Sequence, residues 1–134
     1  MADLPADVRD QYRRLARARR WPPETEAAFL RTVAWYRALD EGPGARDYYE
    51  WGDAESLAGP GTRWLWETAA VSGAVTAVKQ IEVPRDGPVR GYWWRWLEDD
   101  ASGLTGEPLG PDEDGLRPIT REAFYRVWNS RPAD

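Results

Sequence analysis

The residues best able to do chemistry lie in a tryptophan-rich segment that also holds the chain's single lysine, Lys79. The chain has nine tryptophans and neither histidine nor cysteine among its 134 residues. Without histidine it lacks the usual base near neutral pH and the commonest metal ligand. Without cysteine it lacks disulfides, thiolate nucleophiles and the usual structural zinc sites. Any acid–base catalysis would therefore depend on Asp, Glu, Tyr or Lys.

Lys79 falls in the middle of a predicted strand, where side chains alternate between two faces. If Val71 pairs with Ala74 across the first hairpin turn, Lys79 lies opposite Trp66, and the next turn places it opposite Tyr92. We expect the lysine to snorkel, to stack on a ring as a cation–π pair, or to act as a base or anion anchor with a lowered pKa.

This register brings the candidate binding residues onto one face of the predicted sheet. Six side chains on this face are predicted to bind a ligand or partner: Trp64, Trp66, Lys79, Arg90, Tyr92 and Trp94. Flat aromatic side chains either fill a core or line a binding surface. The face is therefore either core under the predicted helices or the wall of an open pocket.

The carboxylates do not form a pattern that demands catalysis. Asp53, Glu55 and Glu67 are candidate acids or bases without a partner at a diagnostic spacing. Acidic runs at 98–100 and 112–114 lack the residue order of a dedicated calcium loop. Nucleotide-binding, serine-hydrolase and zinc-protease motifs are absent from the sequence. We expect no catalytic residue, no metal site and no cofactor.

Charge is unevenly distributed along the chain. Residues 1–20 hold six arginines against three aspartates, a net charge of +3, whereas the remainder holds 12 basic against 20 acidic residues, a net charge of −8. The arginine-rich segment is either a solvated helix surface or a contact for an acidic protein partner. Nucleic acid is an unlikely partner, because the rest of the chain would repel phosphate.

Hydrophobic periodicity predicts the elements that position these residues. The expected fold class is α+β in one domain, 1–134, with an antiparallel meander of three or four strands. Helical spacing predicts an N-terminal helix pair within 1–42 and a C-terminal helix at 119–129 with Thr120 as its N-cap. Period-two spacing predicts a sheet within 62–98, with strands at 62–71, 74–83 and 89–98 and a short strand at 48–51; segment 98–118 is predicted as loop.

The N-terminal residues are acidic and polar, and they lack the basic and apolar regions of a secretory signal. No apolar stretch reaches the length of a membrane helix. We therefore expect a cytoplasmic protein that does not enter a membrane.

Between about residues 78 and 128 the chain reads VKQIEVPRDGPVRGY, then LEDDASGLTGEPL, then PITREAFYRVW. This order resembles small uncharacterised bacterial proteins with an RQIEV strand, a DG turn, a strand containing tyrosine, a GLTxxPL loop and a closing ITxExFxxxW helix. The chain departs from the pattern after Tyr92, where Trp93 and Trp94 replace polar residues, and at Ser102, where glycine is common. The resemblance implies bacterial origin and the strands, loop and final helix, and it implies no activity.

Two functional hypotheses follow from these observations. The first is a non-catalytic binding protein, an immunity- or accessory-type partner of another protein. The second is a small pocket enzyme or ligand carrier of bacterial secondary metabolism, with the aromatic face around an apolar or aromatic ligand.

Overall fold

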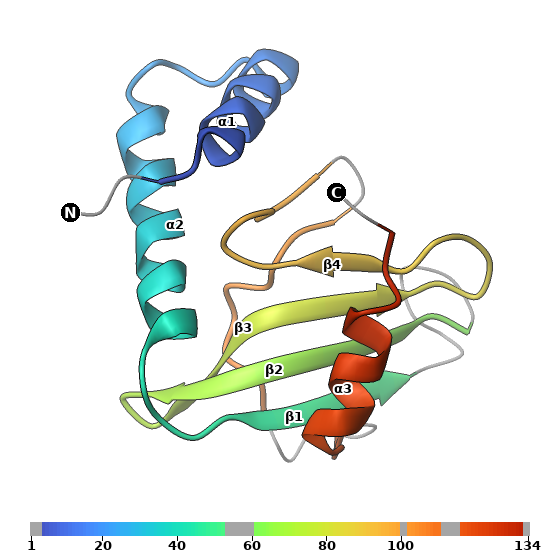
Figure 1. Ribbon diagram of the computed structural model, residues 1–134. Coiled ribbons are helices and arrows are strands. Elements are labelled where there is room, and N and C mark those ends of the chain that lie inside the picture. Colours follow the sequence, from blue (N-terminus) through green and yellow to red (C-terminus); the bar gives the residue numbers. More distant parts are fainter. Residues whose placement is uncertain (1–3, 53–60, 100–101, 111–115, 133–134) are drawn as a thin grey trace.

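The computed structural model describes residues 4–52, 61–99, 102–110 and 116–132. Over these ranges the chain forms helices and one antiparallel sheet, which confirms the α+β class (Figure 1). The helices are α1 (Ala6–Arg19), α2 (Thr25–Glu41) and α3 (Arg121–Trp128). The strands are β1 (Asp47–Gly52), β2 (Arg63–Val71), β3 (Ala74–Val83), β4 (Arg90–Tyr92) and β5 (Leu116–Pro118).

The sheet contains the expected meander and one further strand. Its order is β4-β3-β2-β1-β5, so the first four strands are consecutive antiparallel neighbours. The β2–β3 turn has positive φ at both Ser72 and Gly73, 51° and 83°, as a two-residue turn that matches strand twist requires. β5 pairs with the outer edge of β1. It lies in segment 98–118, which the sequence predicts as loop. Three residues are too few to show a period, and Pro118 is tolerated at a sheet edge.

A β-bulge between β2 and β3 changes the predicted register. Val71 pairs with Ala74 as expected, but the register shifts between Glu67 and Thr68, so Lys79 pairs with Glu67. A shift of one residue moves a side chain to the other face of a sheet. The prediction that Lys79 shares a face with Trp66 is therefore wrong.

The strand predicted at 89–98 is cut short by a turn. Backbone hydrogen bonds join Trp93 and Trp96 in both directions, at 3.1 and 3.0 Å, so the chain reverses after β4. Trp94 lies in this turn and not on the sheet, so its predicted place on the aromatic face is wrong. Its side chain is instead buried among residues of α1 and α2.

Different parts of the chain cover the two faces of the sheet. α3 lies on one face, which we call the α3 face, and the segment that follows β4 crosses behind the sheet on the other, the pocket face (Figure 1). The α3 cluster is built from residues of the sheet and α3: Tyr48, Leu65, Ile81, Phe124 and Trp128. The helix-pair cluster is built from α1, α2 and the 93–96 turn: Val8, Tyr12, Leu15, Phe29, Val33, Tyr36 and Trp94.

The start of α3 and the end of α2 lie at capping residues. The Thr120 hydroxyl accepts a hydrogen bond from the Ala123 N–H at 3.1 Å, which confirms it as the N-cap of α3. α2 ends at Gly42, where a Cβ would lie 2.8 Å from the Ala38 carbonyl oxygen. The Arg46 guanidinium then donates to carbonyl groups at this end of α2, including that of Leu39 at 2.6 Å. The end of α2 is thereby held beside the sheet.

Candidate functional site

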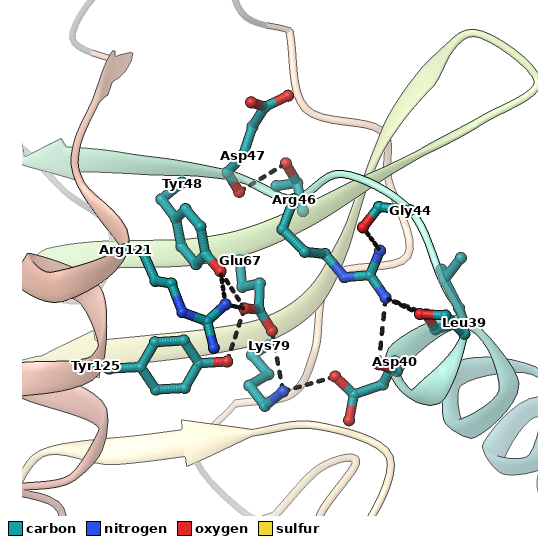
Figure 2. A network of polar contacts seen from close by, with 12 residues as sticks. Leu39, Asp40, Gly44, Arg46, Asp47, Tyr48, Glu67, Lys79, Arg121 and Tyr125 are labelled. Atoms are coloured by element: carbon teal, nitrogen blue, oxygen red, sulfur yellow. Dashed lines mark hydrogen bonds and ion pairs between the residues drawn. The ribbon is translucent and has the colours of Figure 1, made fainter.

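Lys79 lies on the α3 face, in a buried network of ion pairs. Its Nζ donates to Glu67 Oε1 at 3.0 Å and to Asp40 Oδ1 at 2.6 Å (Figure 2). The residue is only 8% exposed. Its ammonium lies 5.5–5.9 Å from the ring centroids of Trp93, Tyr125 and Trp128. Lys79 is thus close to aromatic rings, as predicted, but they are not the rings of Trp66 or Tyr92.

Glu67 is the centre of this network. Its Oε2 accepts hydrogen bonds from the hydroxyls of Tyr48 at 2.6 Å and Tyr125 at 2.7 Å. Burial alone would raise the pKa of Glu67, but these hydroxyls and Lys79 outweigh it and lower the pKa below its ordinary value. Burial, together with the bond to Glu67, raises the pKa of both tyrosines. Arg121 completes the network by donating to the Tyr48 hydroxyl at 2.8 Å.

The network connects five elements of the fold. Asp40 belongs to α2, Tyr48 to β1, Glu67 to β2, Lys79 to β3 and Tyr125 to α3. Each of these side chains bonds to another member, and Glu67 is 2% exposed. We therefore interpret the network as a support that fixes the strands, α2 and α3 relative to one another.

The candidate binding site lies on the pocket face. A cavity of about 530 Å³ is lined by side chains of β1 and β2 and by segment 102–109. We call it the tryptophan pocket, after Trp51, Trp64 and Trp66, which form its wall on the sheet. Leu109, Leu116 and Pro108 add apolar surface, and its remaining lining residues are Gln80, Ser102, Gly103, Thr105 and Glu107.

Gln80 holds segment 102–109, the outer wall of the pocket, against the sheet. Its Oε1 accepts from Trp66 Nε1 and from the Thr105 N–H, both at 3.0 Å, and its Nε2 donates to the Gly103 carbonyl at 2.9 Å. The Leu109 N–H donates to the Val75 carbonyl at 2.8 Å. These bonds attach segment 103–109 to the sheet.

An acidic cluster lies beside the pocket on the same face of the sheet. The Tyr92 hydroxyl donates to the Asp99 carboxylate at 3.1 Å, and the Ser102 N–H donates to Asp99 Oδ1 at 3.0 Å. Glu82 lies opposite Arg90 across β3 and β4, and the Glu82 Oε2 has no hydrogen-bond partner among the described residues. Burial raises the pKa of Glu82, the charge of Asp99 raises it further, and Arg90 and Ser102 lower it in part.

The structure brings together only some of the six predicted site residues. Trp64 and Trp66 line the pocket. Tyr92 and Arg90 lie on the pocket face but are not among its lining residues. Lys79 lies on the opposite face, and Trp94 lies in the helix-pair cluster. The tryptophans of β2 share a face because they are two residues apart on one strand.

Sequence reasoning missed Trp51 and Gln80 on the sheet, and it missed the wall that segment 102–109 forms. Trp51 belongs to the short strand predicted at 48–51, so pairing that strand with 62–71 would have found it. Gln80 moved to the pocket face only because of the bulge. Leu109 and Leu116 lie in a segment without periodicity, so nothing in their spacing indicated a role.

The remaining candidates give no second site. Asp53, Glu55 and the acidic run at 112–114 lie outside the described residues. Within the part of the chain that the structure describes, no group of three or more acidic, histidine or cysteine side chains could hold a metal ion. No helix in the described ranges is long and apolar enough to cross a membrane. Comparison with known protein families, curated proteins and solved structures gives no match.

Proposed function

We propose that this chain is a non-catalytic binding protein whose ligand occupies the tryptophan pocket. One observation carries the proposal: a cavity of about 530 Å³ whose sheet wall consists of three tryptophans. Small-molecule sites typically have this size and combine apolar and aromatic walls with a few polar groups. Each indole offers a large flat surface that an apolar or aromatic ligand can cover.

The polar groups of the pocket support binding more than catalysis. A hydroxyl nucleophile needs a base within hydrogen-bond reach. The Thr105 hydroxyl accepts from the Glu107 N–H at 3.3 Å, the Ser102 hydroxyl bonds to Glu82, which lies outside the lining residues, and Gln80 is used in holding the wall. Within the part of the chain that the structure describes, Glu107 is the single carboxylate that lines the pocket. The second hypothesis was a small pocket enzyme or a ligand carrier, and of these we keep the ligand carrier.

A titration with indole and benzyl alcohol tests the pocket. We expect both probes to perturb the indole N–H resonances of Trp51, Trp64 and Trp66 in a two-dimensional NMR spectrum. Trp64→Ala should weaken binding at least about tenfold, because it removes one wall. Trp35→Ala is the matched control, since Trp35 lies on α2 and is 48% exposed. If neither probe perturbs the pocket, the proposal of an apolar or aromatic ligand is wrong.

The partner-protein hypothesis is favoured by a different surface. Arg13, Arg14 and Arg17 on α1 line a surface hollow of about 510 Å³ together with Asp10 and Ala18. An acidic segment of an immunity- or accessory-type partner would complement this charge. A glutamate-rich peptide should bind with an affinity that falls with salt and with Arg13→Glu/Arg17→Glu. Binding that is unchanged by the double substitution would remove α1 as the contact surface.

A further inference from the structure

We propose that the tryptophan pocket selects an organic cation, an ammonium group carried on a small apolar body. This inference rests on the proposed function and specifies its ligand class. The first observation is the charge of the wall: among the described residues that line the pocket, Glu107 is the one charged residue. Arg90, on the same face of the sheet, lies opposite Glu82 and outside the lining.

The aromatic wall favours the same charge. The face of an indole ring carries negative potential, and tryptophan is the strongest cation–π partner among the side chains. Trp64 pairs with Trp51 across β1 and β2, and Trp66 follows two residues along β2. Three indoles on adjacent strands therefore border one cavity. A cation can contact more than one of them as it leaves water.

Several hydrogen-bond donors of the wall are already used, which disfavours an anion at these groups. Trp66 Nε1 and the Thr105 N–H both donate to Gln80 Oε1. Gln80 Nε2 donates to the Gly103 carbonyl, and the Ser102 N–H donates to Asp99. An anion at these donors would have to break these bonds, and a buried anion without donors is costly. A cation needs only the ring faces and the Glu107 carboxylate.

The rim of the pocket shows how the charged group could be held near water. Glu107 and Pro108 are exposed, whereas Trp66 is 9% exposed. A ligand could therefore place its apolar body against Trp66 and its ammonium between the indoles and Glu107. An ammonium with methyl substituents suits such a site, because it is weakly hydrated and has a large contact surface.

Choline and its carbon isostere, in which a quaternary carbon replaces the ammonium nitrogen, provide the direct test. The two probes have nearly the same shape and differ in charge. Calorimetry and the indole N–H resonances should show that choline binds at least about tenfold more tightly than the isostere. Benzoate, as the anionic probe, should bind most weakly of all.

Two variants link the selectivity to the residues. Glu107→Gln should weaken choline binding several-fold and leave the isostere unchanged. Glu122→Gln is its matched control, because Glu122 is also exposed but lies on α3, across the sheet. Trp64→Phe should keep more of the preference for choline than Trp64→Leu does, since leucine has no π face.

The outcomes separate this inference from the proposed function. Equal binding of choline and isostere, or tighter binding of benzoate, would overturn the cation preference while leaving the pocket as a binding site. Indole binding without choline binding would do the same. A complete lack of binding by choline, isostere, indole and benzyl alcohol would overturn both proposals.

Discussion

At the scale of single residues, the structural role of Lys79 depends on the two carboxylates that contact it. Asp40 and Glu67 both lie within hydrogen-bond distance of its ammonium, and the side chains are 10% exposed or less. A buried ion pair contributes little net stability compared with an apolar replacement of both partners, but removing one partner leaves an uncompensated buried charge. The lysine therefore matters more for folding than its predicted role on an aromatic face suggested.

Lys79→Met tests this interpretation. The variant should lose about 3–5 kcal/mol in the free energy of unfolding measured by urea denaturation, because Glu67 and Asp40 stay buried without their cation. Arg13→Met is the matched control, since Arg13 pairs with Asp10 at an exposed position and should change stability by about 1 kcal/mol or less. A loss below about 1 kcal/mol for Lys79→Met would mean that the network does not support the fold.

The contribution of Glu82 to stability should change with pH in the direction opposite to that of a carboxylate paired with a cation. Its pKa is raised above the ordinary value of 4.5, so the folded state holds this proton more tightly than the unfolded state does. Its contribution to stability is present below pH 4.5 and is lost as pH rises through the raised pKa.

Glu82→Gln should therefore be more stable than the natural chain at neutral pH and equally stable well below pH 4.5. Thermal unfolding across this range measures the difference. Glu122→Gln removes the same charge at an exposed site and is the matched control. If the Glu82→Gln advantage grew toward low pH, the direction assigned to the Glu82 pKa would be wrong.

At the scale of elements, the sequence predicted strands and turns better than register. The turn at Ser72 and Gly73 correctly placed Val71 opposite Ala74, because both residue types are common in turns and Gly73 adopts positive φ without a Cβ clash. The bulge near Val78 carries no glycine that would have indicated it. It brings Lys79 opposite Glu67 while leaving Ala77 and Val78 fully buried. Tertiary burial thus determined the register beyond the first half of the hairpin.

The same scale explains why half of the pocket was unforeseen. Trp64 and Trp66 follow from the alternation of one strand, which local sequence encodes. The opposite wall comes from segment 102–109, whose position depends on its hydrogen bonds with the Gln80 side chain and the Val75 carbonyl. Such long-range contacts leave no periodic pattern in the segment itself. For a pocket between a strand and a loop, the sequence therefore predicts the wall on the strand and not the wall on the loop.

The N-cap of α3 gives a prediction that belongs to an element. Thr120→Ala should lose about 1 kcal/mol, because the Ala123 N–H loses its acceptor at the first turn of the helix. Thr32→Ala is the matched control: Thr32 is exposed within α2 and bonds back to the Ala28 carbonyl, a bond that does not favour the helix. Its stability should be unchanged or slightly higher. Equal losses for the two variants would contradict the capping role.

At the scale of the whole molecule, the helix pair and the sheet are connected through the turn after β4. Trp94 is buried in the helix-pair cluster, whereas Trp93 contacts both that cluster and the α3 cluster. The Trp93 ring centroid lies 5.5 Å from that of Trp94 and 5.6 Å from that of Trp128. Gln11 of α1 adds hydrogen bonds to Arg95 and Leu97 in the same segment. We therefore predict that the chain unfolds as a single cooperative unit.

Urea unfolding followed by two probes tests this cooperativity. Far-UV circular dichroism reports mainly on the helices and tryptophan fluorescence on the packed indoles, and the two transitions should coincide in the natural chain. Trp93→Ala should cost about 3 kcal/mol and separate them, because it removes the side chain that both clusters share. Trp35→Ala removes an exposed indole from α2 and should leave the transitions coincident. Separate transitions in the natural chain would show that the helix pair folds independently of the sheet, and the pocket could then persist without it.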